Sequence, residues 1–270
     1  GKTGSIHDLT IADASVKSTK VGTYSEKTVY AALVAASNAG TISSVTLKNS
    51  KVSGGYIVGG VVGQNSGTVT GCANESAVVE QNAAKDAGVG GIVGNNEATV
   101  SVSYNKAHIV RGHDNLRYSY LGGIVGNNSS NTSVIESCYN WGEIDTAYYT
   151  GGIVGKASGK VTYCYSVGKV SSDKKALIGT GSPTVKGCYY LNTCGAEDTK
   201  GTAKTAEEFK TLAASLGGAF ADADPYPTLK WQDPNATFTI TLTVKPANAS
   251  VTVTGAANVG TPEVRTDSEK

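Results

Sequence analysis

The amino-acid sequence predicts an all-β fold, a right-handed parallel β-helix or solenoid of about six rungs with about 30 residues each. The first observation is a glycine-flanked apolar segment that recurs at intervals of 31, 32 and 29 residues, beginning at Gly59, Gly90, Gly122 and Gly151. The second is that the segments of each repeat have strand length, about 4–6 residues, and no helical periodicity. The third is that no repeat could bury its apolar face alone, so stacked repeats must share one core.

The same order of segments recurs in each repeat: an apolar strand, a turn of Asn, Ser and Gly, a strand of the pattern xVxxCYN, and a short final strand. The four clear repeats open with GGVVGQN, GGIVGNN, GGIVGNN and GGIVGKA. A degenerate unit from Ala31 precedes them, and a shortened unit from Ala176 follows. Residues 6–16 alternate apolar and polar side chains like a lone strand and are a candidate for the first rung.

One small residue recurs at the same position of every unit: Val45, Cys72, Ser103, Cys138, Cys164 and Cys188. Free cysteine behaves as a small buried hydrophobe, so the four cysteines of this column are expected to be structural core residues. A zinc site is the rival interpretation, but it needs CxxC-type pairs, which the sequence lacks. Cys194 lies outside the column, and a local disulfide with Cys188 is left open.

An aromatic residue usually follows the core column: Tyr104, Tyr139, Tyr165 and Tyr189. If the cysteines point inward, strand alternation points these rings outward. Such a stripe either stacks ring on ring or offers a surface to sugar rings or a partner, so Tyr139 and Tyr165 are candidate binding residues. A column of Asn65, Asn96 and Asn128 is interpreted as turn residues that tolerate left-handed backbone, with a possible hydrogen-bonded ladder.

The repeated glycines do not match a nucleotide-binding loop. In GVGGIVG (residues 88–94) the glycine spacing is wrong for a dinucleotide fold, and a strand follows where a helix is needed. In TGGIVGKA (residues 150–157) the first position is Thr and the last is Ala, where a phosphate loop needs Gly and then Ser or Thr. A membrane G-x-x-x-G contact is excluded by the polar surroundings. No cofactor, metal or nucleotide is therefore expected.

Composition excludes further classes of function. The 23 Lys and Arg residues nearly balance the 22 Asp and Glu residues, leaving a net charge of +1, which does not indicate a nucleic-acid groove. The longest apolar runs are about five residues, against about 20 for a membrane-spanning helix. The sequence has no Met, even at position 1, which is expected of a mature or trimmed chain whose targeting segment has been removed.

The C-terminal part departs from the repeat. Residues 205–216 are expected to form a helix, with a capping box of Thr205 and Glu208 and a stop at Gly217. We expect this helix, with residues 227–231, to cover the exposed core of the last rung. The segment TFTITLTVKPANASVTVTG after residue 236 predicts a β-hairpin. The predicted domains are therefore a solenoid (1–192), a cap (193–236) and a tail (237–270) that resembles the start of an Ig-like or PEGA-like module.

The repeats resemble the GLUG-motif family, whose units carry a G-[LIV]-[VI]-G core, an Asn/Ser/Gly turn and a C-Y-x strand. The resemblance covers residues 31–192, although AALVAA replaces the glycine-rich core in the first unit. Residues 205–232 are similar to the segment that often closes such repeats. The resemblance implies a bacterial protein that is secreted or attached to the cell surface, and it carries over no catalytic residue. The motif also occurs in some IgA-specific metallopeptidases.

The best candidate binding site is the stretch RGHDNLRYSY (residues 111–120), which inserts charged and aromatic residues between two regular units. Insertions in solenoids often lie on a binding face. The candidate binding residues here are Arg111, His113, Asp114, Arg117, Tyr118 and Tyr120. The simpler interpretation of this stretch is a solvated loop.

These observations predict a non-catalytic exported module, of the kind found on gut commensal bacteria, with an adhesive or spacer role. Its partner would be a host or dietary glycan or a cell-surface protein, and the chain would act as a monomer within a larger multidomain protein. One alternative is a polysaccharide-acting β-helix enzyme that uses Asp114, Glu143 or Asp145 as acid or base. Another is an accessory domain of a surface protease. The acidic residues form no column across the repeats, which favours the non-catalytic interpretation.

Overall fold

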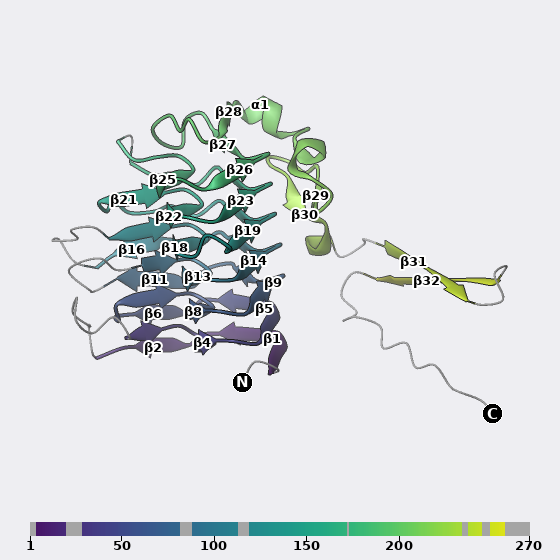
Figure 1. Cartoon of the computed structure of the whole chain (residues 1–270), viewed down its shortest axis with the longest axis horizontal. Helices are drawn as coiled ribbons and strands as arrows, with labels where there is room; N and C mark the ends of the chain where they lie inside the picture. The colour runs from purple at the N-terminus through teal and green to yellow at the C-terminus, as the bar shows by residue number, and fades with distance from the viewer. Residues whose placement is uncertain are drawn as a thin grey trace.

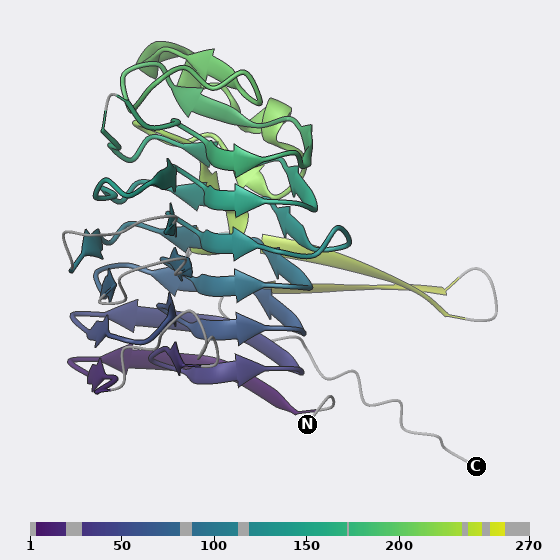
Figure 2. The same cartoon turned by 60° about the vertical axis from the view of Figure 1, so that its left-hand side comes forward.

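The computed structural model shows a parallel β-solenoid in which the chain winds through stacked rungs (Figure 1, Figure 2). It describes residues 4–19, 29–81, 88–112, 119–171, 173–233, 237–244 and 249–256. Within these residues, helical structure is confined to short segments after residue 205. The fold class predicted from the repeat is therefore confirmed.

The described part of the solenoid consists of four parallel sheets, named here in the order in which a repeat passes through them. Sheet 1 contains β3 (Tyr30–Ala31), β7 (Ile57–Gly59), β12 (Gly88–Gly90), β17 (Tyr120–Gly122) and β21 (Tyr149–Gly151). Sheet 2 contains β4 (Ala35–Asn38), β8 (Val62–Asn65), β13 (Val93–Asn96), β18 (Val125–Asn128), β22 (Val154–Ala157) and β25 (Ile178–Gly181). Sheet 4 contains β2 (Ser15–Lys17), β6 (Lys51–Ser53), β11 (Val78–Gln81) and β16 (Ile109–Arg111).

Sheet 3 has the most strands because most repeats contribute two short strands to it. It begins with β1 (Ser5–Ala12) and β5 (Thr41–Lys48). One limb continues with β9 (Thr68–Thr70), β14 (Thr99–Ser101), β19 (Val134–Glu136), β23 (Lys160–Thr162) and β26 (Thr184–Lys186). The other continues with β10 (Ala73–Asn74), β15 (Tyr104–Asn105), β20 (Tyr139–Asn140), β24 (Tyr165–Ser166), β27 (Tyr189–Leu191) and β28 (Thr202–Lys204).

The strands stack in register, so that like residues form columns along the axis. In sheet 2, a column of aliphatic side chains fills the core: Val62, Val93, Val125, Val154 and Ile178. Burying each such side chain contributes about 1.5–3 kcal/mol relative to leaving it exposed. At the N-terminal end, β1 pairs with β5 and β2 pairs with β6, so residues 6–16 form a rung as predicted.

The cysteine column lies inside this core. Cys72, Cys138, Cys164 and Cys188 are at most 3% exposed. Burial raises the pKa of the Cys72 thiol to about 12, and it also raises the pKa of the Cys164 thiol, so both stay protonated at neutral pH. All five cysteines are free, so the structure contains no disulfide between Cys188 and Cys194.

A left-handed residue precedes each of the six members of the core column and also Leu9, which pairs with Val45, and the sequence analysis did not anticipate this. These residues, with φ between 49° and 60°, are Asp8, Ser44, Gly71, Val102, Ser137, Tyr163 and Gly187. The left-handed corner interrupts the inward–outward alternation, so that Val69 and Cys72 both point into the core although they are three residues apart. Such a conformation costs about 1 kcal/mol for a residue other than glycine. The corner divides sheet 3 into its two limbs.

The predicted asparagine column is a buried ladder. Asn38 donates its side-chain amide to Asn65 over 2.8 Å, Asn65 donates to Asn96 over 2.8 Å, and Asn96 donates to Asn128 over 2.7 Å. Each donor also binds the backbone two residues later, for example Asn96 to the carbonyl of Ala98. The prediction of left-handed backbone is wrong, because these residues end strands of sheet 2 and have no positive φ. Their side chains, rather than their backbone freedom, hold the turns.

The tyrosines that follow the core column point outward and stack on one another. The ring centroids of Tyr104 and Tyr139 are 4.9 Å apart, and those of Tyr139 and Tyr165 are 5.2 Å apart. These three residues, called the ring column below, are nevertheless buried, at 3%, 0% and 0% exposed. Their outer side must therefore be covered by another part of the chain.

Residues 205–233, called the cap segment, cover the ring column. The cap segment contains α1 (Ala206–Phe209), η1 (Ala213–Leu216), β29 (Phe220–Ala221), β30 (Thr228–Leu229) and η2 (Lys230–Gln232). Phe209 packs 5.4 Å from the Tyr165 ring, and Trp231 packs 5.5 Å from the Tyr104 ring. Tyr139 donates its hydroxyl to Gln232 over 3.0 Å, and the indole of Trp231 donates to the carbonyl of Val102 over 3.1 Å.

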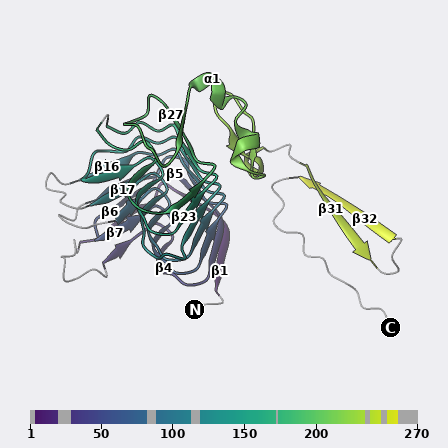
Figure 3. The same cartoon turned by 45° about the horizontal axis from the view of Figure 1, so that its top comes forward.

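This placement corrects the prediction that the cap segment covers the end of the solenoid. It lies along the flank, next to the β10–β27 limb of sheet 3 (Figure 3). The physical reason is that the stacked aromatic rings form an apolar surface that the repeats leave uncovered, and each ring buries about 150–250 Å² when covered. The last rung is closed instead by residues 192–204, where the carboxylate of the buried Asp198 accepts a hydrogen bond from the Ile178 amide over 2.6 Å.

The helix in the cap segment is shorter than predicted. The capping box of Thr205 and Glu208 is present, but the α-helix ends at Phe209 and is followed by η1. The amide of Ala213 donates to the side chain of Asp222 over 2.9 Å, which starts η1 separately from α1. The predicted β-hairpin is present and consists of β31 (Thr237–Val244) and β32 (Ala249–Ala256).

Candidate functional site

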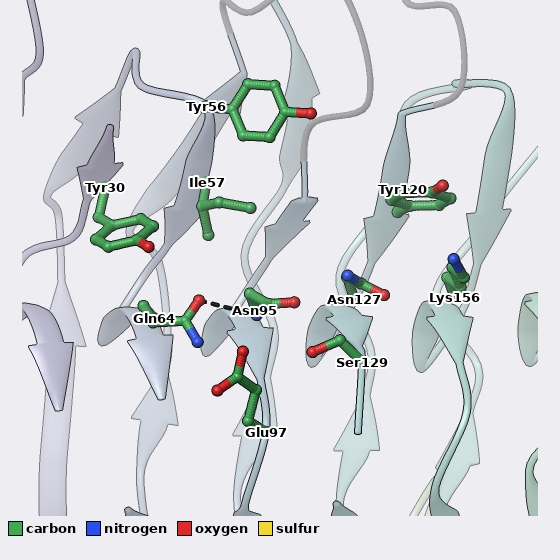
Figure 4. A pocket seen from close by; sticks show the side chains of 10 residues that line it. All are labelled: Tyr30, Tyr56, Ile57, Gln64, Asn95, Glu97, Tyr120, Asn127, Ser129 and Lys156. Carbon is green, nitrogen blue, oxygen red and sulfur yellow. Dashed lines mark hydrogen bonds between the residues drawn. The ribbon is translucent and has the colours of Figure 1, made fainter. Parts of the chain in front are cut away.

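A groove of about 670 Å³ lies on the outside of the solenoid between sheets 1 and 2 (Figure 4). Its lining residues come from five successive rungs: Tyr30, Tyr56, Ile57, Gln64, Asn95, Glu97, Tyr120, Asn127, Ser129 and Lys156. The two sheets can approach closely here because a glycine stands at the crease in each repeat. A Cβ atom on Gly126 would lie only 2.3 Å from the Val89 nitrogen.

The outer row of sheet 1 forms one wall of the groove. Strand pairing places its members in one column: Tyr30, Ile57, Gly88, Tyr120 and Tyr149. The Tyr120 and Tyr149 rings stack with centroids 5.6 Å apart. Gly88 is the one small residue of this described column. The position is closed by its neighbours, because a Cβ atom on Gly88 would lie 2.9 Å from the Gly94 carbonyl oxygen and 3.4 Å from the Cδ1 atom of Ile57.

The outer row of sheet 2 forms the opposite wall, and it is polar. Its members in the groove are Gln64, Asn95, Asn127 and Lys156. Asn95 donates its side-chain amide to Gln64 over 2.8 Å. Among the described residues, the side-chain oxygens of Asn95 and Asn127 are buried and have no hydrogen-bond partner. The Lys156 ammonium lies 5.3 Å from the centroid of the Tyr120 ring.

Among the described residues, one of the sequence-predicted binding residues lies in the groove. Tyr120 lines it, whereas Arg111 is exposed at the end of β16. Arg111 donates its backbone amide to the Asp145 carboxylate over 2.9 Å and a side-chain nitrogen to the Thr146 carbonyl over 3.3 Å. The other candidates of the inserted stretch, His113, Asp114, Arg117 and Tyr118, lie outside the described residues.

Two candidate binding residues are corrected by the structure. Tyr139 and Tyr165 are fully buried beneath the cap segment and cannot meet a ligand in this conformation. The sequence analysis correctly predicted that these rings stack and point outward, but it did not anticipate that another segment covers them. That contact depends on the cap segment, which is not part of the repeat.

The buried ring column should make the stability of the folded protein sensitive to alkaline pH. Burial raises the pKa of Tyr104, Tyr139 and Tyr165 above the usual value of about 10, because the charged phenolate loses its hydration. The folded state therefore favours the neutral phenols. Their contribution to stability is fully present below about pH 10 and is lost as the pH rises beyond that value.

We accordingly expect the melting temperature to fall between about pH 9 and pH 11, with tyrosine ionisation coinciding with unfolding. Thermal melts and the absorbance of tyrosinate at these pH values would check this. A Tyr139→Phe variant should lose less stability over the same range, because it has one fewer buried phenol to ionise. Tyr148, which is 53% exposed, provides the control: Tyr148→Phe should follow the wild-type profile. An equal alkaline loss in all three proteins would contradict the assignment.

Of the carboxylates considered for the enzymatic alternative, Asp145 and Glu143 lie in the described part of the chain, where they are engaged or exposed, and Asp114 lies outside it. Asp145 lies 2.8 Å from the Nε2 atom of His108 and also accepts the Arg111 amide, so it fixes the end of β16. Glu143 is exposed, and its backbone carbonyl accepts the Ile109 amide over 2.9 Å. Within the described ranges, no group of three or more His, Cys, Asp or Glu side chains is arranged to hold a metal ion.

The residues of the groove that the sequence analysis missed are the outer row of sheet 2, with Glu97 and Ser129 beside it, and Tyr30, Tyr56 and Ile57 of the opposite wall. A signal for the outer row was present, because Gln64, Asn95, Asn127 and Lys156 each directly follow the third glycine of the repeat opening. Alternation then places them on the outer face if Asn65, Asn96 and Asn128 point inward. No sequence pattern indicates that Tyr30 and Tyr56 face this row, because their distance from it depends on the angle between sheets 1 and 2.

The described chain is thus a parallel β-solenoid with a lateral groove and a segment docked on its flank. None of its described helices is long and apolar enough to cross a membrane. The family model of the GLUG motif matches residues 146–171, which include β21 to β24, so the chain carries the GLUG motif. Comparison with curated proteins and comparison with solved structures each gave no match.

Proposed function

We propose that this chain is a non-catalytic module of an exported bacterial protein, secreted or attached to the cell surface, that binds a glycan or a protein in an adhesive or spacer role. The single observation that supports this proposal is the groove, in which tyrosine side chains face a polar row of three amides and one lysine, with lining residues drawn from five rungs. The GLUG motif adds support for an extracellular β-solenoid module. The near balance of charge, at +1, favours glycan or protein over nucleic acid as the partner.

The enzymatic alternatives have less support. A glycoside hydrolase uses two carboxyl groups that flank the scissile bond. Glu97 is the one carboxylate that lines the groove among the described residues, so the lining does not supply the second carboxyl group that this reaction needs. A turnover screen on plant and mucin polysaccharides distinguishes the alternatives: we expect no cleavage, and cleavage abolished by Asp114→Ala or Asp145→Ala would overturn the proposal.

Binding itself is tested with the purified chain on immobilised mucin, before and after enzymatic removal of the glycans, together with a glycan array. We expect saturable binding to at least one of these surfaces. Binding that survives deglycosylation would identify a protein partner, and binding that is lost would identify a glycan. An absence of binding to all of them would contradict the adhesive role.

A further inference from the structure

Two charged side chains line the groove, Glu97 and Lys156. Neither forms an ion pair with another residue in the described part of the chain. Their backbones are two rungs apart, because Lys156 pairs with Asn127, which pairs with Asn95 in the rung of Glu97. Two rungs correspond to about 10 Å along the solenoid axis. The groove therefore has an uncompensated positive charge at one end and an uncompensated negative charge nearer its middle.

The positive charge lies beside an aromatic ring. Figure 4 shows the side chain of Lys156 rising from sheet 2 towards Tyr120 of sheet 1. The Lys156 ammonium is 5.3 Å from the centroid of that ring. A cation–π contact of this kind contributes about 0.5–1 kcal/mol at an exposed site, and it leaves the ammonium without a counter-ion. This end of the groove thus presents a cation and an aromatic ring side by side.

The pair selects a carboxylate that is attached to a ring. The ammonium donates hydrogen bonds and attracts an anionic acceptor. In an acidic sugar the carboxylate is bonded directly to the sugar ring, whose C–H face packs on an aromatic side chain. One rigid unit therefore meets Lys156 and Tyr120 together, with little conformational entropy lost on binding. An acidic side chain of a peptide would reach Lys156 on a flexible stem and would bring no ring for Tyr120.

The remainder of the groove favours uncharged units. Beyond Lys156 the outer row of sheet 2 continues with the amide side chains of Asn127, Asn95 and Gln64. Glu97 also lines this part of the groove, and it is exposed. A second carboxylate near Glu97 would meet a like charge, which is unfavourable. A glycan with a carboxylate on every unit would lose at Glu97 part of the affinity that it gains at Lys156.

We propose that the groove binds a glycan with one carboxylate-bearing sugar, and that Lys156 and Tyr120 form the subsite for that sugar. The carboxylate pairs with the Lys156 ammonium while the ring that carries it packs against Tyr120. Neutral units of the same glycan lie along the amide row towards Tyr30 and Tyr56, and Glu97 disfavours a second acidic unit. This inference rests on the proposed binding function and adds the ligand class and the residues that select it.

Calorimetry on matched pairs of ligands tests the subsite: a xylo-oligosaccharide with and without one glucuronate, and sialyllactose against lactose. We expect the acidic member of a pair to bind about three- to tenfold more tightly, and the difference to shrink as the salt concentration rises. Lys156→Gln should remove the difference and leave binding of the neutral member unchanged. The control is Lys160→Gln, which removes the same charge from an exposed lysine of sheet 3 outside the groove and should keep the difference.

Two further substitutions test the ring and the negative charge. Tyr120→Ala should weaken binding of both members of a pair about five- to tenfold, whereas Tyr120→Phe, which keeps the ring, should retain it. Glu97→Gln should strengthen binding of oligogalacturonate, in which every unit carries a carboxylate, without changing binding of the neutral ligands. Melting curves of each variant show whether the fold is kept.

The outcomes separate this inference from the proposed function. Equal binding of the acidic and neutral members of both pairs to the wild-type protein would overturn the subsite while leaving an adhesive module in place. A preference for the acidic member that survives Lys156→Gln would also overturn it, as would equally tight binding of a Glu-rich peptide. By contrast, an absence of binding to glycans, intact mucin and deglycosylated mucin alike would contradict the proposed function itself.

Discussion

Replacing Gly123 by alanine is expected to destabilise the solenoid by about 3 kcal/mol, because the added methyl group has no space. Its Cβ would lie 2.2 Å from the Cγ atom of Asn140 and 2.3 Å from the carbonyl oxygen of Gly152, which belongs to the next rung. Gly60, Gly91 and Gly152 stand at the same position of their own repeats. A Cβ atom on each of them would lie 2.2 Å from a carbonyl oxygen of the following rung. This glycine column therefore sets how closely the rungs stack.

Chemical denaturation followed by circular dichroism would measure the loss. The matched control is Gly71→Ala, where a Cβ would meet its nearest heavy atom at 3.6 Å and the strain comes only from the left-handed backbone, with φ of +60°. That variant should lose about 1 kcal/mol. If both variants lose the same free energy of unfolding, the close approach of the rungs at Gly123 does not restrict the size of the side chain there.

Ending the chain after Lys204 should destabilise the solenoid by a similar or larger amount. The truncation removes the cap segment and exposes the ring column together with the partly buried Trp141 and Val102. It keeps β28, so the edge of sheet 3 remains paired with β27. Since burying one large side chain contributes about 1.5–3 kcal/mol, uncovering several of them should cost more than any single core substitution. We expect aggregation, or a melting temperature lower by about 10 °C or more.

Light scattering, a hydrophobic dye and thermal melts would measure this effect. The control is a chain ended after Asp233, which keeps the entire cap segment and should melt like the full chain. A soluble truncated protein with an unchanged melting curve and no dye binding would show that the cap segment does not stabilise the solenoid.

Several features of the fold could be inferred from the sequence because they repeat. Each unit has nearly the same length, so residues one period apart become neighbours whatever the details of the turns. The cysteine column, the asparagine ladder and the stacked tyrosines all follow from that single relation. The first rung at residues 6–16 was also predicted, because its apolar alternation matches the strands on which it stacks.

The features that the repeat does not contain could not be inferred in this way. The cap segment occurs once, so no period relates it to its neighbours, and its place depends on which apolar surface remains uncovered. The left-handed corners were missed because five of the seven residues are not glycine, and their conformation is imposed by the pairing on both sides.

The groove also combines features that follow from the repeat with features that do not. The repeat implies which residues of sheet 2 point outward, and the sequence alone therefore contains the row of Gln64, Asn95, Asn127 and Lys156. Whether a tyrosine wall stands opposite that row depends on the angle between sheets 1 and 2, which close packing at the glycine crease determines. Local periodicity thus specified the rungs and their columns, whereas long-range packing decided which columns were covered and which remained available to a ligand.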